Sequence, residues 1–168
     1  MSNTVAADKT HEEYREYIDA PESLSTKIDI LADLVRQHHG NVVFYTGAGI
    51  STGAGIPDFR SGLGSVTGMP PGKWCTDATK NQWTEQERRD IQARRRKTTS
   101  ALQAIPTPSH MALVALREAG VVKGLISQNC DGLHRRSGFD PHALAELHGN
   151  TNLECVGQNF SCVFADSD

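Results

Sequence analysis

The sequence has no apolar run long enough to cross a bilayer. Its longest runs, such as Val42–Tyr45, fall far short of the roughly 20 residues that a membrane-spanning helix requires. Residues 1–10 lack the basic start and apolar stretch of a secretory signal, so we expect an intracellular protein with no membrane partner. Of the 168 residues, 38% are hydrophobic and 22% are charged, which excludes a disordered or fibrous chain and fits one ordinary globular domain.

Cysteine is scarce, with four residues at positions 75, 130, 155 and 162. In an intracellular protein, so few cysteines argue against a disulfide framework. Only Cys155 and Cys162 lie near each other in the sequence, with six residues between them. A structural zinc site needs four ligands and uses more closely spaced cysteine pairs, so we predict no metal site.

Basic charge is not in excess, and the net charge of −3 excludes a globally basic nucleic-acid-binding protein. Direct, sequence-specific binding of nucleic acid is therefore not expected. Residues 84–97 nevertheless carry six basic and three acidic side chains and end in Arg94–Lys97. This run could contact phosphate or direct nuclear import, but a solvated surface is the interpretation that we favour.

The hydrophobic pattern predicts a polar lead over residues 1–18, then a helix and a strand. Asp19 and Glu22 have the spacing of a capping box for a helix that runs to about Gln37 and ends at Gly40. The predicted apolar stripe of this helix comprises Leu24, Ile28, Leu31 and Val35. Residues 41–45 are apolar without alternation, which is typical of a fully buried strand.

Periodicity is lost over residues 62–98, a long loop that contains a predicted helix between Thr84 and Thr98. Thr107 and Pro108 then begin a helix that ends near Gly120. Its predicted apolar stripe comprises Met111, Val114 and Ala115.

The last predicted elements are a strand over residues 121–127 and a helix over residues 141–147. Alternating helices and strands are typical of a parallel α/β sheet with helices on both faces.

Glycines are concentrated after the first predicted strand, in Gly47–Gly53. A glycine-rich loop between a strand and the start of a helix lets the backbone turn tightly and approach a diphosphate. Backbone amide hydrogens at the start of the helix then interact with the negative charge of the diphosphate. The spacing is one residue longer than in the usual dinucleotide motif, so the loop alone is equally compatible with a plain turn. The continuation Pro57–Arg60 adds an arginine suited to phosphate and an aromatic ring suited to a ribose or nicotinamide face.

Three segments in this order resemble the signature of the sirtuins, the NAD-dependent protein deacylases. They are Tyr45–Arg60, then Ser127–His134, similar to the family's Gln-Asn-x-Asp-Gly-Leu-His element, and Glu146–Asn150, similar to the segment with the catalytic histidine. The helix before Gly40 and the element Pro106–His110 resemble the branch that contains the nuclear sirtuins. Over residues 17–155 the resemblance implies a Rossmann-like fold, NAD as cosubstrate, and a nuclear location with the cytoplasm as the alternative.

The resemblance implies a role for each matching residue. The residues expected to contact NAD are Gly47, Ala48, Gly49, Ser51, Thr52, Asp58, Phe59, Arg60, Gln128, Asn129 and Asp131. The glycine loop would lie against the diphosphate, Arg60 would meet phosphate, and Phe59 would cover the anomeric carbon. Asn129 and Asp131 would order the ribose, a water molecule and the nicotinamide amide, and with His148 they are the expected catalytic residues.

In the mechanism that the resemblance implies, the carbonyl oxygen of an acyl-lysine attacks the anomeric carbon of NAD and nicotinamide leaves. A ribose hydroxyl, deprotonated through His148, then attacks the resulting imidate, and an imidazole that titrates near neutrality suits this transfer. The substrate would be an acyl-lysine protein, with histone tails among the expected targets. His110 and His134 are assigned to packing, while Asn129 and Asp131 could alternatively build an Asx turn.

The sequence departs from the family pattern after residue 154. Sirtuins hold zinc with two pairs of closely spaced cysteines, whereas Cys155 falls one residue short of the expected first ligand and residues 155–168 form a divergent tail. We therefore expect residues 19–154 to be a partial NAD-binding domain, incomplete in its C-terminal half, with the zinc module largely missing. Within it, residues 62–98 form the cofactor loop and a helical insert, in which Trp74 either replaces the family's loop tryptophan or packs.

Three functions follow as expectations. An NAD-dependent protein deacylase is favoured by the matching site residues. The alternatives are a catalytically silent, truncated sirtuin that acts as a binding fragment and an ADP-ribosyl transferase that uses the same nicotinamide chemistry. The sequence makes no prediction of the oligomeric state.

Overall fold

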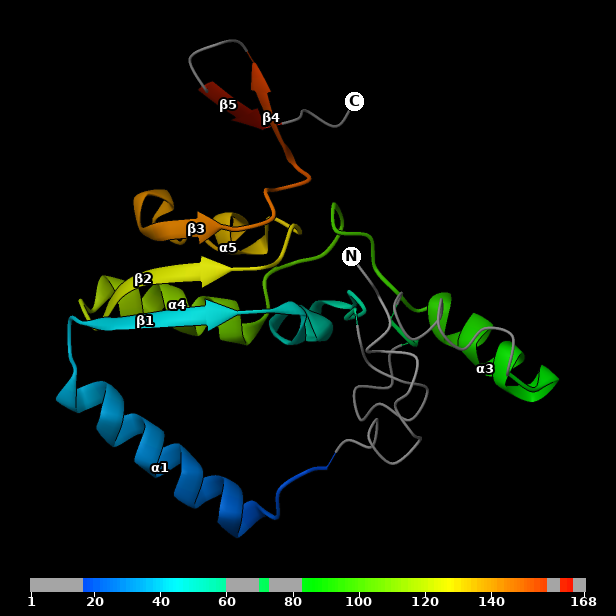
Figure 1. Ribbon diagram of the computed structural model, residues 1–168, viewed down its shortest axis with the longest axis horizontal. Helices are drawn as coiled ribbons and strands as arrows, with labels where there is room; N and C mark the ends of the chain where they lie inside the picture. The colour runs from blue at the N-terminus through cyan, green and yellow to red at the C-terminus, as the bar shows by residue number, and fades with distance from the viewer. Residues whose placement is uncertain (1–16, 60–69, 73–82, 157–160, 165–168) are drawn as a thin grey trace, which may run out of the picture.

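The computed structural model describes residues 17–59, 70–72, 83–156 and 161–164 (Figure 1). The described elements are, in chain order, α1 (Pro21–Gln37), β1 (Val42–Thr46), the 3-10 helix η1 (Ala48–Ala54), α3 (Glu85–Arg95), α4 (Pro108–Glu118), β2 (Val122–Ser127), α5 (Leu133–Arg136), the 3-10 helix η2 (Pro141–Ala143), β3 (Leu144–Glu146), β4 (Leu153–Val156) and β5 (Ser161–Phe164). Among the described helices, none combines the length and the apolar character needed to cross a membrane.

The central sheet is parallel, with the strand order β1-β2-β3. Parallel neighbours require crossover connections, which helices supply here, and the predicted α/β class is confirmed. β4 and β5 form a separate antiparallel pair that lies beyond β3 in Figure 1. β5 and the second half of β4 fall within residues 155–168, which were expected only to be a divergent tail.

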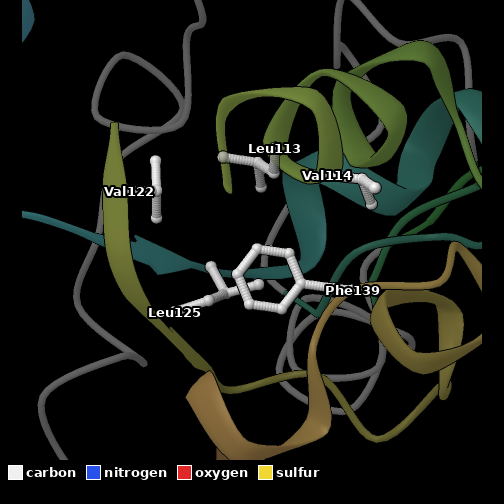
Figure 2. Packing of buried hydrophobic residues seen from close by; sticks show 5 residues of the cluster. All are labelled: Leu113, Val114, Val122, Leu125 and Phe139. Atoms are coloured by element: carbon white, nitrogen blue, oxygen red, sulfur yellow. The ribbon is translucent and has the colours of Figure 1, made fainter. Parts of the chain in front are cut away.

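The core lies between α4 and β2 and is closed by the loop before η2. Its buried members are Leu113, Val114, Val122, Leu125 and Phe139. Figure 2 shows the Phe139 ring beside Leu125, with the Leu113 and Val114 side chains of α4 on the same side of β2. Burial of five such side chains removes enough apolar surface to fix α4 on the sheet.

α4 begins as predicted but turns a different face to the core. Thr107 forms a capping box with His110, whose ring nitrogen accepts the Thr107 N–H, and Pro108 follows at the first helical position. The predicted stripe is wrong at two positions, because Met111 and Ala115 are exposed and only Val114 is buried. The core face is instead formed by His110, Leu113 and Val114, so a histidine occupies a position that an apolar residue was expected to fill.

α1 has the predicted extent but neither the predicted cap nor the predicted burial. Ala20 is its N-cap and no side chain caps it, because the Asp19 carboxylate pairs with Lys27 Nζ at 2.7 Å. None of its residues is buried, and the predicted core residues Leu24 and Ile28 are about half exposed. A cavity of about 610 Å³, lined mostly by apolar residues, separates α1 from α4 and β1.

The helix predicted over residues 141–147 is wrong. The Asp140 side chain accepts the His142 N–H, which starts the short turn η2, and the chain then extends into β3. Leu144 to Glu146 pair with Leu125 to Ser127 of β2. The short apolar stretch did not distinguish a helix from a buried strand, and pairing with β2 decides for the strand.

Candidate functional site

Three segments of the sheet end at one edge. In the strand register, Thr46 of β1 lies beside Ser127 of β2, which in turn lies beside Glu146 of β3. The loops that follow these residues carry the glycine segment, the Gln128–Asp131 segment and His148. The carboxyl edge of a parallel sheet is where such folds place ligands, so the fold brings the three sequence motifs together there.

The glycine loop folds into η1, with Gly47 as its N-cap. Gly47 has an extended φ of −133°, so its conformation is open to any residue. Among the residues that the structure describes, no atom lies within 4 Å of a Cβ built on Gly49, which leaves space above the loop. The glycines therefore provide room for close approach rather than a left-handed turn.

A buried hydrogen-bond group connects the first and second loops. Ser51 is 1% exposed, and its hydroxyl donates to the Asp131 carboxylate at 2.6 Å. The Asn129 amide donates to the Gly47 carbonyl oxygen at 2.9 Å and approaches the Ser51 hydroxyl oxygen at 3.3 Å. Asp131 also accepts the Leu133 N–H at 2.9 Å, which is the geometry of an Asx turn. The turn and the link to Ser51 coexist in this structure.

Two adjoining cavities open over these loops. The first, of about 380 Å³, is lined by Ser51, Ile56, Pro57, Cys130, Asp131 and Thr151 among others. The second, of about 670 Å³, is lined by Gly47, Gly49, Gln128 and His148. Ala48, Asp58, Phe59 and Asn129 line both cavities. Because they share these lining residues, the two cavities are two parts of one site. Their combined volume is larger than a single aromatic ring needs.

His148 lies at the second cavity with a defined tautomer. Its Nδ1 is 2.9 Å from the Gln128 carbonyl oxygen. A carbonyl oxygen only accepts, so Nδ1 carries the proton, and in the neutral ring Nε2 is the acceptor. This arrangement is the one that a general base requires.

The loop that carries His148 is held to its neighbours on both sides. The Leu147 N–H donates to the Ser127 carbonyl oxygen at 2.9 Å, and the Thr151 hydroxyl and N–H both donate to the Cys130 carbonyl oxygen. Glu146 accepts from Arg135 Nε at 2.6 Å and from Asn150 Nδ2 at 2.8 Å. The position of the imidazole is therefore set by α5 and by the β2 loop.

Comparison with known proteins identifies the family. The model of the Sir2 family matches residues 47–165, more than half of the chain. The chain belongs to the Sir2 family. It is 42% identical over 139 residues to NAD-dependent protein deacetylase Sirt6 of Drosophila melanogaster, and 44% identical over 139 residues to NAD-dependent protein deacetylase SRT1 of Oryza sativa subsp. indica. A solved Sir2 structure with a p53 peptide and NAD+ is similar at 29% identity and a TM-score of 0.51.

These sirtuins are longer than this chain. The two alignments each cover 83% of this chain but only 37% of the Drosophila relative and 25% of the rice relative. The structural match covers 82% of this chain and 52% of the solved one. The resemblance to sirtuins and the Rossmann-like class are both confirmed, while the activity of the longer relatives is carried to this chain only as a proposal.

The structure brings most of the predicted sirtuin site residues to one place. The residues that line the two cavities are Gly47, Ala48, Gly49, Ser51, Asp58, Phe59, Gln128, Asn129, Asp131 and His148. Thr52 lies in the same loop, but its hydroxyl donates to the Gly49 carbonyl oxygen at 2.9 Å. Arg60 and Trp74 fall outside the described residues.

Three features of this candidate site were not predicted from the sequence. Cys130, to which it assigned no chemistry, lines the first cavity, and its thiol donates to the His148 carbonyl oxygen at 3.4 Å. Thr151 was not singled out, although it lines the same cavity. Glu146 was quoted only as part of a motif, and its link to Arg135 depends on a contact that no local pattern shows.

Beneath the Ser51–Asp131 pair lie two buried histidines, as their assignment to packing predicted. His110 and His134 are at most 2% exposed, and their ring centroids are 4.7 Å apart. His134 Nε2 lies 2.9 Å from the Thr46 hydroxyl, whereas His134 Nδ1 and His110 Nε2 have no hydrogen-bond partner among the described residues. Burial and the neighbouring His110 lower the pKa of His134 to about 4, and burial also lowers the pKa of His110. Both rings are neutral at physiological pH.

The resemblance to sirtuins implies a zinc site, whereas the cysteine spacing of this sequence predicts none. Within the described ranges, no group of three or more His, Cys, Asp or Glu side chains is placed to hold a metal ion. The side chains of Cys155 and Cys162 are not among those described. The missing zinc site therefore stays a prediction.

Proposed function

We propose that this chain binds NAD at the carboxyl edge of its sheet and supports sirtuin-type deacylation of acyl-lysine proteins. The observation that carries the proposal is the position of His148. It lines the same cavity as the glycine loop, and its Nδ1 proton is held by the Gln128 carbonyl. A base whose acceptor nitrogen is Nε2, beside a loop suited to a diphosphate, fits a reaction on a dinucleotide.

The described residues fit NAD in shape and chemistry. The space above Gly49 gives the backbone amides of η1 access to a diphosphate. The adjoining cavity is mostly apolar, with Asn129, Asp131 and the Ile56 and Pro57 side chains around it, which suits a flat ring with one amide. Phe59 is 53% exposed at the boundary of both cavities, where its ring could cover the sugar between them.

The roles of the residues follow from these positions. Gly47, Ala48 and Gly49 would hold the diphosphate, joined by Thr52 and by Arg60. Gln128 and Asn129 would contact the nicotinamide ribose, and Asp58 would support the loop at the nicotinamide end. Ser51 is bound to Asp131 through its hydroxyl, so we assign it to positioning Asp131 rather than to a direct side-chain contact with phosphate.

When bound, NAD would supply an anomeric carbon that loses nicotinamide and accepts the acyl oxygen of the substrate. The contribution of this chain is to exclude water from that carbon with Phe59, to orient the ribose with Asn129, and to accept a proton at His148 Nε2. The Cys130 thiol and the Gln128 carbonyl both contact His148 and hold the loop in place.

Acyl-lysine proteins are the proposed substrate class, supported by the solved Sir2 structure that contains a p53 peptide. Histone tails and a nuclear location extend the proposal from the resemblance to the nuclear branch, which the similarity to Sirt6 supports. The preference of the chain among acetylated peptides tests the first, and its location in cells tests the second.

The test is nicotinamide release from NAD by the 168-residue chain, with and without an acetyl-lysine peptide. We expect release that requires the peptide and falls at least about 100-fold in His148→Ala, the range for loss of a general base. The matched control is His142→Ala, which removes an exposed histidine of η2 outside the site.

The other outcomes separate the alternatives. Nicotinamide release that does not require the peptide would indicate ADP-ribosyl transfer or NAD hydrolysis instead of deacylation. Binding of NAD without release would leave a catalytically silent binding fragment. Release that is the same in His148→Ala and in the wild type would overturn the assignment of the base.

A further inference from the structure

The charged side chains of helix α3 have no role in the proposed NAD site. It spans Glu85–Arg95, and it projects away from the sheet in Figure 1. The helix is stably built, because Thr84 and Glu87 form a capping box and Ile91 is 4% exposed. A capped helix with one buried anchor presents its other faces to solvent in a fixed arrangement.

Basic residues occupy one exposed face of this helix. Arg89 and Arg96 are seven residues apart, so they lie two turns apart on the same side, and Arg95 flanks them. Arg96 keeps helical angles, with φ −65° and ψ −17°, and extends the face beyond the last assigned turn. All three side chains and that of Lys97 are exposed, and in the described part of the chain none of the four forms an ion pair.

Of the acidic residues of α3, Glu85 lies in the first turn, four residues before Arg89 and on the same side of the helix, and the other two lie on other sides. Glu87 is engaged in the capping box, and Asp90 accepts from Gln86 at 3.0 Å. No acidic residue occurs from Ile91 to Lys97, in a chain whose net charge is −3. The last turn of α3 and the two residues after it therefore carry only positive charge, whereas the whole chain carries a net negative charge.

We propose that this basic face of α3, formed by Arg89, Arg95, Arg96 and Lys97, binds the phosphate backbone of double-stranded DNA without sequence preference. Guanidinium groups match phosphate oxygens through paired hydrogen bonds. Seven helical residues span about 10.5 Å along the axis. That span is close to the major-groove width of about 12 Å, so Arg89 and Arg96 would reach the phosphates on opposite walls.

The composition of the face argues against other polyanions. An anionic membrane favours a helix with an apolar face opposite its charges, but the only large apolar side chain of α3, Ile91, is buried. Duplex RNA has a deep and narrow major groove that does not admit a helix. The face has no aromatic side chain on which the bases of a single strand could stack.

The experiment measures fluorescence anisotropy of a labelled 20-base-pair DNA duplex titrated with the full chain. Four phosphate contacts predict a slope near −3.6 for log affinity against log salt, hence about a 150-fold loss of affinity between 50 and 200 mM salt. The combined variant Arg89→Gln, Arg95→Gln and Arg96→Gln should flatten that slope to about −1. A second duplex of unrelated sequence should bind equally.

The matched control removes three positive charges from other exposed positions: Lys27→Gln, Arg36→Gln and Lys123→Gln. It should keep the slope and affinity of the wild type. Glutamine is a good helix former, and circular dichroism checks that α3 persists in the test variant.

Equal loss of binding in the two triple variants would reduce the effect to net charge and contradict the proposal. So would the absence of duplex binding at 50 mM salt. Equal or tighter binding to duplex RNA, to polyglutamate or to phosphatidylserine vesicles would assign the face to another partner.

Discussion

The pH dependence of stability tests the buried histidine pair. His134 has a pKa of about 4 in the folded chain, because burial and the neighbouring His110 disfavour its charged form. An unfolded histidine titrates near 6.5. The folded pKa lies below the unfolded one, so acid protonates the unfolded chain first. Stability from the neutral ring is present above pH 6.5 and is lost as the pH falls towards 4.

The magnitude follows from the two pKa values. A difference of about 2.5 units corresponds to roughly 3 kcal/mol over the whole window. About 2 kcal/mol of this should be lost between pH 7.5 and pH 5. Asp131 raises the pKa of both histidines and so opposes the effect, but it is not the largest influence on either ring.

The assay is urea unfolding at pH 7.5, 6 and 5 of the wild type and of His134→Gln, whose side chain does not titrate. The free energy of unfolding of the wild type should fall by about 2 kcal/mol more than that of the variant between pH 7.5 and 5. His142→Gln, at an exposed position, should follow the wild type. Equal losses in the wild type and in His134→Gln would refute the argument, since His134 would then titrate alike in both states.

Two further predictions concern packing. Gly55 has a φ of +85°, and a Cβ there would lie 2.5 Å from the Thr99 hydroxyl, so Gly55→Ala should cost about 2 to 5 kcal/mol in urea unfolding. An unchanged unfolding midpoint would show that the turn can rearrange. Phe139 is 2% exposed beside Leu125, so Phe139→Ala should lower the free energy of unfolding by about 3 to 5 kcal/mol. A decrease of under about 1 kcal/mol would place Phe139 outside the core.

The sequence predicted the position of the elements better than the faces that they bury. The Thr107–Pro108 start and the strands before Gly47 and Gln128 follow from local chemistry, and the structure has them within a residue. The capping box at Asp19 was wrong, because the nearby Lys27 offers that carboxylate an ion pair. The stripe of α4 was wrong because tertiary contacts, and not apolar spacing alone, turned His110 into the core.

The site was predicted from motifs, and its internal contacts were not. Gly47, Asn129 and His148 were named from the sequence, and the parallel register explains why they meet. The Ser51–Asp131 bond joins residues 80 positions apart, and no local pattern encodes such a pair. The same holds for the contact of His110 with His134, each of which the sequence could assign only to packing.

The central claim, that the space above the glycine loop receives NAD, is tested most directly by thermal unfolding of the wild type and of Gly49→Ala with and without NAD. The added methyl group would meet no atom of the described residues within 4 Å, so the Tm without NAD should be unchanged. At 100 times its Kd, NAD should stabilise the wild type by about 2.7 kcal/mol, a Tm increase of roughly 5 to 11 °C. Gly49→Ala should lose most of that increase, because the methyl group occupies the space of the diphosphate. No increase in the wild type, or the same increase in Gly49→Ala, would contradict the account.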